Sequence, residues 1–120
     1  MATATKNKRT LFASGAIGAG ATQALTEIDL STALGGLLTV KITNGASGPT
    51  TNTTVKIYIG HATGEKKLFQ QVVAGTTNNE VYEWTFEIPP AAMFVGGDII
   101  AGATNGITAE ALLSELTSIG

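Results

Sequence analysis

The chain has 120 residues, the size of one domain with one hydrophobic core, and carries a net charge of −2 at pH 7. Hydrophobic residues make up 43% of it and charged residues only 13%, because Thr, Asn, Ser and Gly replace much of the usual charge. There is no cysteine, which excludes disulfides and thiolate metal sites. No run of about 18 apolar residues occurs, so we expect no membrane-spanning helix.

Charge is distributed unevenly along the chain. The first ten residues hold Lys6, Lys8 and Arg9 and no acidic residue, which leaves four cations against nine anions in the rest. These first residues are mostly Thr, Lys, Asn and Ala and have little apolar surface to bury. We therefore predict two parts, an extended basic N-terminal arm over residues 1–10 and a single β-sandwich domain over residues 11–120.

Apolar and polar residues alternate with period two over most of the chain, which is the pattern of β-strands with one buried face. The alternation predicts strands over residues 11–16, 24–30, 38–43, 55–59, 67–75, 81–88 and 93–101. Turn-forming runs separate them, most clearly NGASGPTTN at residues 44–52 and TTNN at residues 76–79. Gly96 and Gly97 interrupt the seventh segment and predict a bulge or a corner there.

The last segment, ITAEALLSELTSIG, fits two structures. Its Ala, Leu and Glu content favours a helix capped by Thr108, with the leucines on one stripe. As a strand its alternation is less regular. Seven preceding strands leave sheet edges to be closed, so we favour a strand over a helix for residues 107–119.

About eight short strands with regularly spaced turns and almost no helix signal predict an all-β protein with an antiparallel β-sandwich. A jelly-roll-like topology is preferred over an immunoglobulin-like one, because the Cys and Trp pattern of the latter is missing. The core is expected to contain large apolar residues of the alternating strands, namely Val40, Ile42, Ile57, Ile59, Trp84 and Phe86.

The segment VYEWTFEI at residues 81–88 places three aromatic residues on one face and Glu83 and Glu87 on the other. The two carboxylates lie about 13 Å apart along a strand, whereas a glycosidase pair needs at most about 9.5 Å. The aromatic face is more simply explained as a core face than as a sugar-binding platform. We predict a central strand with its aromatic residues inward and its carboxylates outward.

No pattern in the sequence supports a catalytic, cofactor or metal site. His61 is the single histidine and has no GxSxG motif nearby, so a solvated loop residue is expected. The run GHATGEKK lacks the glycine spacing of a phosphate-binding loop and the Ser or Thr that follows its lysine. Asp98 has no other carboxylate at the spacing that a metal-binding loop requires. Three clustered cations are too few for a nucleic-acid footprint on an acidic body. We expect no enzyme activity, cofactor, metal or nucleic-acid partner.

Three segments, LLTVKITNGASGP, TVKIYIGHATGEKKLFQQVVAG and WTFEIPPAAMFVGGDIIAGATNGITAEA, resemble small virion proteins of tailed bacteriophages in their pattern and order. Within that class they are similar to head decoration (cement) proteins with a jelly-roll fold. The resemblance covers residues 37–111. It implies a protein without catalytic residues that clamps the capsid exterior, associates as a trimer or dimer over capsid symmetry axes, and reaches neighbouring capsomers with terminal arms.

This resemblance implies a location on the capsid surface of the virion, with the major capsid protein as partner and self-association as a trimer favoured over a dimer. Lys6, Lys8 and Arg9 are the candidate capsid-contact residues, because they form a cationic cluster on an acidic body and viral shells commonly offer acidic seams. Two alternatives stay open, a tail-fibre or baseplate β-domain and a carbohydrate-binding module. An exposed Trp84 would favour the sugar module, and a buried Trp84 together with contacts made by the termini would favour the capsid role.

Overall fold

The computed structural model describes residues 4–62 and 65–119. These residues form eight β-strands, which are β1 Ala4–Ile17, β2 Thr22–Asp29, β3 Gly36–Asn44, β4 Thr53–Gly60, β5 Lys67–Ala74, β6 Val81–Ile88, β7 Phe94–Ile100 and β8 Ile107–Ile119. In this part of the chain no helix occurs that is long and apolar enough to cross a membrane. Each segment predicted as a strand from its alternation overlaps one of these strands.

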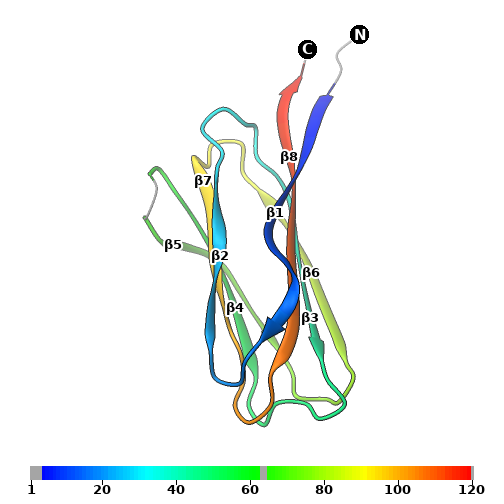
Figure 1. Cartoon of the computed structure of the whole chain (residues 1–120). Coiled ribbons are helices and arrows are strands. Elements are labelled where there is room, and N and C mark those ends of the chain that lie inside the picture. Colours follow the sequence, from blue (N-terminus) through cyan, green and yellow to red (C-terminus); the bar gives the residue numbers. More distant parts are fainter. Residues whose placement is uncertain (1–3, 63–64, 120) are drawn as a thin grey trace.

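The strands form two four-stranded sheets that pack face to face (Figure 1). Sheet A has the strand order β1-β8-β3-β6, and sheet B has the order β2-β7-β4-β5. All neighbouring strands are antiparallel. Most connections cross from one sheet to the other, which is the arrangement of a jelly roll. The prediction of an all-β antiparallel sandwich with about eight strands is confirmed.

The C-terminal segment is a strand and not a helix. This was expected, because the preceding strands leave sheet edges to be closed. β8 lies between β1 and β3 and pairs with both. Ile107, Ala109, Ala111 and Leu113 are buried at alternate positions, as the inner face of a strand requires. Pairing with two neighbours therefore outweighs the helix propensity of Ala, Leu and Glu.

The core lies between the inner faces of the two sheets and is mainly aliphatic. Its largest fully buried hydrophobic side chains are Leu11, Leu30, Leu38, Val40, Ile42, Val55, Ile57, Ile88, Val95, Ile99 and Leu113. Three of the predicted core residues, Val40, Ile42 and Ile57, are fully buried. The alternation of β3 and β4 therefore identified the buried face correctly.

β6 is an edge strand of sheet A and not the central strand predicted from its apolar alternation. Its residues Trp84 and Phe86 pack against the core but are only partly buried, as is Ile59 of β4. An edge strand has a neighbour on one side only, so its inward side chains are less completely enclosed. Periodicity indicates which face of a strand is buried and not its place in the sheet, so this part of the prediction is wrong.

The bulge predicted at the double glycine is present, but the extra residue lies in the neighbouring strand. Leu25 of β2 pairs with Gly97 of β7, whereas Ile28 pairs with Val95, so β2 has one residue more over this stretch. A Cβ atom at Gly97 would collide with the backbone carbonyl of Lys56 on β4. The glycine allows β7 to stay paired on both sides.

The paired ends of β1 and β8 extend beyond the rest of sheet A, next to the two termini (Figure 1). β3 begins at Gly36, opposite Glu115, whereas β8 continues to Ile119 in pairing with β1. Residues 4–10 of the predicted basic arm are the first part of β1, and residues 1–3 lie outside the described residues. From residue 4 onward the arm is extended and paired with β8. The division of the chain into an arm over residues 1–10 and a domain over residues 11–120 stays a prediction.

Candidate interaction surface

One cross-strand row at the terminal end of sheet A contains a residue from each of its four strands. Successive pairings place Lys8, Ser114, Leu37 and Glu87 side by side in this order. Leu38, the next residue along β3, is fully buried, so Leu37 and its row point away from the core. The row therefore lies on the solvent face of sheet A.

A groove with a volume of about 600 Å³ lies on this face. Its apolar lining includes Leu34, Leu37, Pro90 and Leu116, and Lys6 and Glu87 also line it. Leu34 is 41% exposed and Leu37 is 52% exposed. Two large apolar side chains at this exposure, both lining one groove, offer a surface on which a partner could bury apolar area.

Two glycines shape the groove at the start of β3. A Cβ atom at Gly36 would collide with the backbone carbonyl of Ser114, so β3 and β8 approach closely there. Gly35 has a φ of 79°, in the region that favours glycine, and a Cβ at this position would collide with the carbonyl of Ile88. The backbone therefore turns sharply between Leu34 and β3, which leaves the groove open.

The three cations predicted to contact a capsid do not share one face. Lys6 lines the groove, and Lys8 lies in the outward row beside it. Arg9 pairs in register with the buried Leu113 and so lies on the opposite face of β1. The structure keeps Lys6 and Lys8 together as surface cations and separates Arg9 from them.

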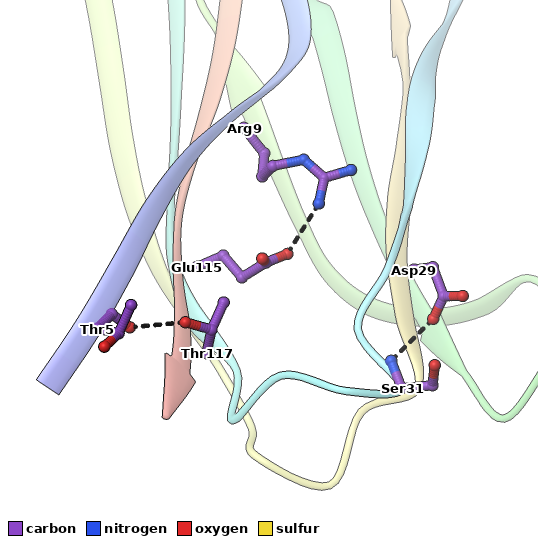
Figure 2. A network of polar contacts seen from close by, with 6 residues as sticks. All are labelled: Thr5, Arg9, Asp29, Ser31, Glu115 and Thr117. Carbon is purple, nitrogen blue, oxygen red and sulfur yellow. Dashed lines mark hydrogen bonds and ion pairs between the residues drawn. The ribbon is translucent and has the colours of Figure 1, made fainter. Parts of the chain in front are cut away.

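Arg9 forms an ion pair with Glu115 between β1 and β8 (Figure 2). Its Nη1 donates a hydrogen bond to Oε2 of Glu115 at 3.2 Å. The Glu115 side chain is 7% exposed and that of Arg9 43% exposed, so the pair is partly desolvated. Nearby, Oγ1 of Thr117 donates to the backbone carbonyl of Thr5 at 3.1 Å, which gives a second link between the strands (Figure 2).

Asp29, at the end of β2, lies in the same region of the molecule (Figure 2). Its Oδ1 accepts a hydrogen bond from the backbone N–H of Ser31 at 2.8 Å. This bond is the main reason that the pKa of the Asp29 carboxyl lies below its ordinary value of 3.8, and the charge of Arg9 lowers it further. Arg9 thus interacts with acidic residues of its own chain.

Residues considered for catalysis or metal binding are not brought together. His61 is exposed in the turn after β4, as predicted. Asp98 lies in register with Lys56 on sheet B, and Glu83 lies in register with Lys41 on sheet A. Among the described residues, no group of three or more His, Cys, Asp or Glu side chains is placed to hold a metal ion.

Trp84 is neither fully buried nor fully exposed. Its ring stacks on that of Tyr82 with centroids 6.3 Å apart and an interplanar angle of 15°. Both rings pack against the core from the β6 edge. This half-buried position does not separate the sugar-binding alternative from the capsid role.

Sequence reasoning missed the groove. Its apolar residues come from the turn before β3, β3 itself, the turn after β6 and the C-terminal part of β8, so no local pattern marks them as a group. One signal was available in LGGLL at residues 34–38, because adjacent leucines in a strand point to opposite faces and only one of the two can be buried.

No protein-family model and no curated protein matches the sequence. A chain from infectious bursal disease virus, Gx strain, has a similar fold with a TM-score of 0.62 and 13% identity, covering 94% of this chain and 32% of that chain. A protein of Bacillus endospore appendages, described as disulfide-linked pili, has a TM-score of 0.58 and 14% identity over 98% and 90% of the two chains. The SPBc2 prophage-derived protein YomS has a TM-score of 0.52 and 20% identity over 93% and 95%. These matches support a jelly-roll-like fold, and at these identities they show the fold alone.

Proposed function

We propose that this protein is a structural component of a bacteriophage virion that binds the outside of the capsid and stabilises the shell. The observation that carries the proposal is the apolar groove on the outer face of sheet A, which Lys6 and Glu87 also line. Exposed apolar residues next to charged ones are the arrangement of a protein–protein interface, with an apolar centre and a polar rim. The groove lies beside Lys6 and Lys8, two of the three cations for which capsid contact was predicted.

The fold supports the same proposal. The alignment with the prophage-derived protein covers 93% of this chain and 95% of that one, so the two chains share the fold over most of their lengths. A viral chain shares the fold over 94% of this chain. A single jelly roll that presents an apolar groove suits a subunit that binds to a shell, and the proposal assigns no reaction to it.

Docking would combine two contributions with different dependence on salt. Lys6 and Lys8 are exposed cations that would be attracted to acidic seams of a shell, and this attraction weakens as ionic strength rises. Leu34 and Leu37 contribute burial of apolar surface, worth about 25 cal/mol per Å², which salt does not screen. Binding should therefore weaken with salt without being lost.

Co-sedimentation with purified phage capsids that lack the protein tests this proposal. Replacing Leu37 by Gln keeps the size and charge of the side chain but removes apolar surface from the groove. The variant should bind about tenfold more weakly, because burying a leucine contributes about 1.5–3 kcal/mol and Leu37 is already half covered. Circular dichroism checks that the variant is folded.

Leu68→Gln is the matched control, since Leu68 is 56% exposed compared with 52% for Leu37 and lies on sheet B. This variant should bind capsids as the wild type does. Unchanged binding by Leu37→Gln, or an equal loss in both variants, contradicts the role of the groove. If the folded wild-type protein binds no capsid at all, the tail-fibre or baseplate alternative takes its place.

A further inference from the structure

The two edges of sheet A carry opposite charges on the same outer face. β6 presents Glu83 and Glu87 at one edge, and β1 presents Lys6 and Lys8 at the other. All four side chains belong to exposed residues. Because the four strands alternate in direction, β1 and β6 run opposite to each other, so a second copy placed beside the first continues the antiparallel order.

The register of the sheet brings one cation and one anion to the same level. Lys8 and Glu87 stand at the two ends of the outward row described above. If a second copy adds without stagger, its Lys8 becomes the direct cross-strand neighbour of Glu87. Opposite side chains in such a position have Cβ atoms about 4.5–5.5 Å apart, within reach of an ammonium–carboxylate pair. In the next outward row Thr85 would face Thr10 of the second copy.

The backbone of both edges is suited to this pairing. The N–H of Asn44 donates to the carbonyl of Glu80 at 2.9 Å, so the even-numbered residues of β6 point their backbone groups toward β3. The backbone N–H and C=O groups that point to the open edge are then those of Val81, Glu83, Thr85 and Glu87. The pairing of β6 with β3 has no register shift, and neither does that of residues 6–10 with β8, so regular stretches are available on both edges.

The inward side of the same junction would cover aromatic surface. Phe86 is only partly buried, and the row that contains it passes through Leu38 and Leu113 and ends at Arg9. Without stagger, Arg9 of the second copy would lie beside Phe86 of the first. Because the guanidinium group of Arg9 is paired with Glu115, its aliphatic stem would cover the aromatic ring. The junction is therefore complementary on both faces of the sheet.

We propose that copies of this protein associate head to tail, with the β6 edge of one copy paired with the β1 edge of the next and Glu87 facing Lys8. The contact uses different surfaces on the two partners, so it either closes into a ring or grows into a filament. The chain has no cysteine, so disulfides cannot link the copies. This inference follows from the register and charges of sheet A and does not depend on capsid binding.

Two charge reversals, Lys8→Glu and Glu87→Lys, test the proposal in sedimentation-velocity experiments at low salt. Each variant places like charges at every junction and should associate about tenfold more weakly than the wild type. The double variant again has opposite charges at every junction, with the sides exchanged, and should recover wild-type association. Glu110→Lys is the matched control, because it makes the same charge change on β8, an interior strand of the same sheet. It should associate as the wild type does.

Mixing the two single variants gives a result that a folding defect cannot produce. Lys8→Glu leaves acidic residues at both edges and Glu87→Lys leaves basic residues at both, so each variant alone repels copies of itself. An equimolar mixture brings opposite charges together at every junction and should associate like the wild type. A wild type that stays a 12.2-kDa monomer at low salt and high concentration overturns the proposal. Single variants that associate normally, or a mixture that stays monomeric, overturn it equally.

Discussion

Arg9 differs from Lys6 and Lys8 in what surrounds its charge. Its guanidinium group is paired with the carboxylate of Glu115, whose side chain is only 7% exposed. Removing the partner of a carboxylate in that position leaves a desolvated charge without its hydrogen bond, which costs more than the loss of a surface cation. Lys8 lies on the exposed face of β1, where no such cost arises. Of the three cations, Arg9 therefore stabilises the fold, and the two lysines remain available to a partner.

Replacing Arg9 by Ala should lower the free energy of unfolding by about 1–2 kcal/mol. The loss stays below that of a fully buried pair because the Arg9 side chain is 43% exposed and therefore partly screened by solvent. Lys8→Ala should change the same free energy by less than about 0.5 kcal/mol. Urea unfolding followed by the fluorescence of Trp84 measures both values. Equal stability of the two variants would show that the Arg9–Glu115 pair does not support the fold.

The different roles of these cations could not be predicted from the sequence. Residues 4–10 contain few apolar residues, so no alternation predicts a strand before residue 11. They are ordered by β8, which is more than 100 positions away in the chain and provides Leu113 and Glu115 as neighbours. A local sequence pattern does not include the distant strand β8. Without β8, the face of β1 on which Arg9 lies cannot be predicted.

Among the strands, β6 and β8 show what alternation can and cannot predict. For β6 it identified the inward aromatic face correctly, but it does not encode how many neighbours a strand has, and β6 lies at an edge. For β8 it was irregular and local propensity favoured a helix, yet two paired neighbours make the segment a strand. The groove of the candidate site was not predictable in this way, because it lies between elements and depends on the sharp turn at Gly35.

The edge position of β6 has a consequence for stability that can be measured. Phe86 and Leu38 are cross-strand neighbours, but Leu38 is fully buried and Phe86 only partly. Leu38→Ala should therefore cost about 2–5 kcal/mol of unfolding free energy, and Phe86→Ala only about 1–3 kcal/mol although a larger side chain is removed. Chemical denaturation of both variants provides the comparison. A larger cost for Phe86→Ala than for Leu38→Ala would mean that β6 is enclosed like an interior strand.

For the whole molecule, the two proposed contacts use adjoining surfaces that share Glu87, which lines the groove and faces Lys8 of the next copy in the junction. The groove lies on the outer face of sheet A, whereas β1 and β6 form the two sides of that sheet. A subunit that uses Lys8 and Glu87 at its edges keeps Lys6, Leu34 and Leu37 for a shell, so it could bind the shell and neighbouring copies at the same time. Linked copies would bind a capsid more tightly than a single copy, because each further contact forms at a high effective concentration.

Cryo-electron microscopy of phage capsids incubated with the wild-type protein tests capsid binding most directly. The proposed function predicts jelly-roll density on the outside of the shell, with the outer face of sheet A toward the capsid and Leu34 and Leu37 at the contact. Shells without added density, or density in which the groove faces solvent and another surface touches the capsid, would contradict it.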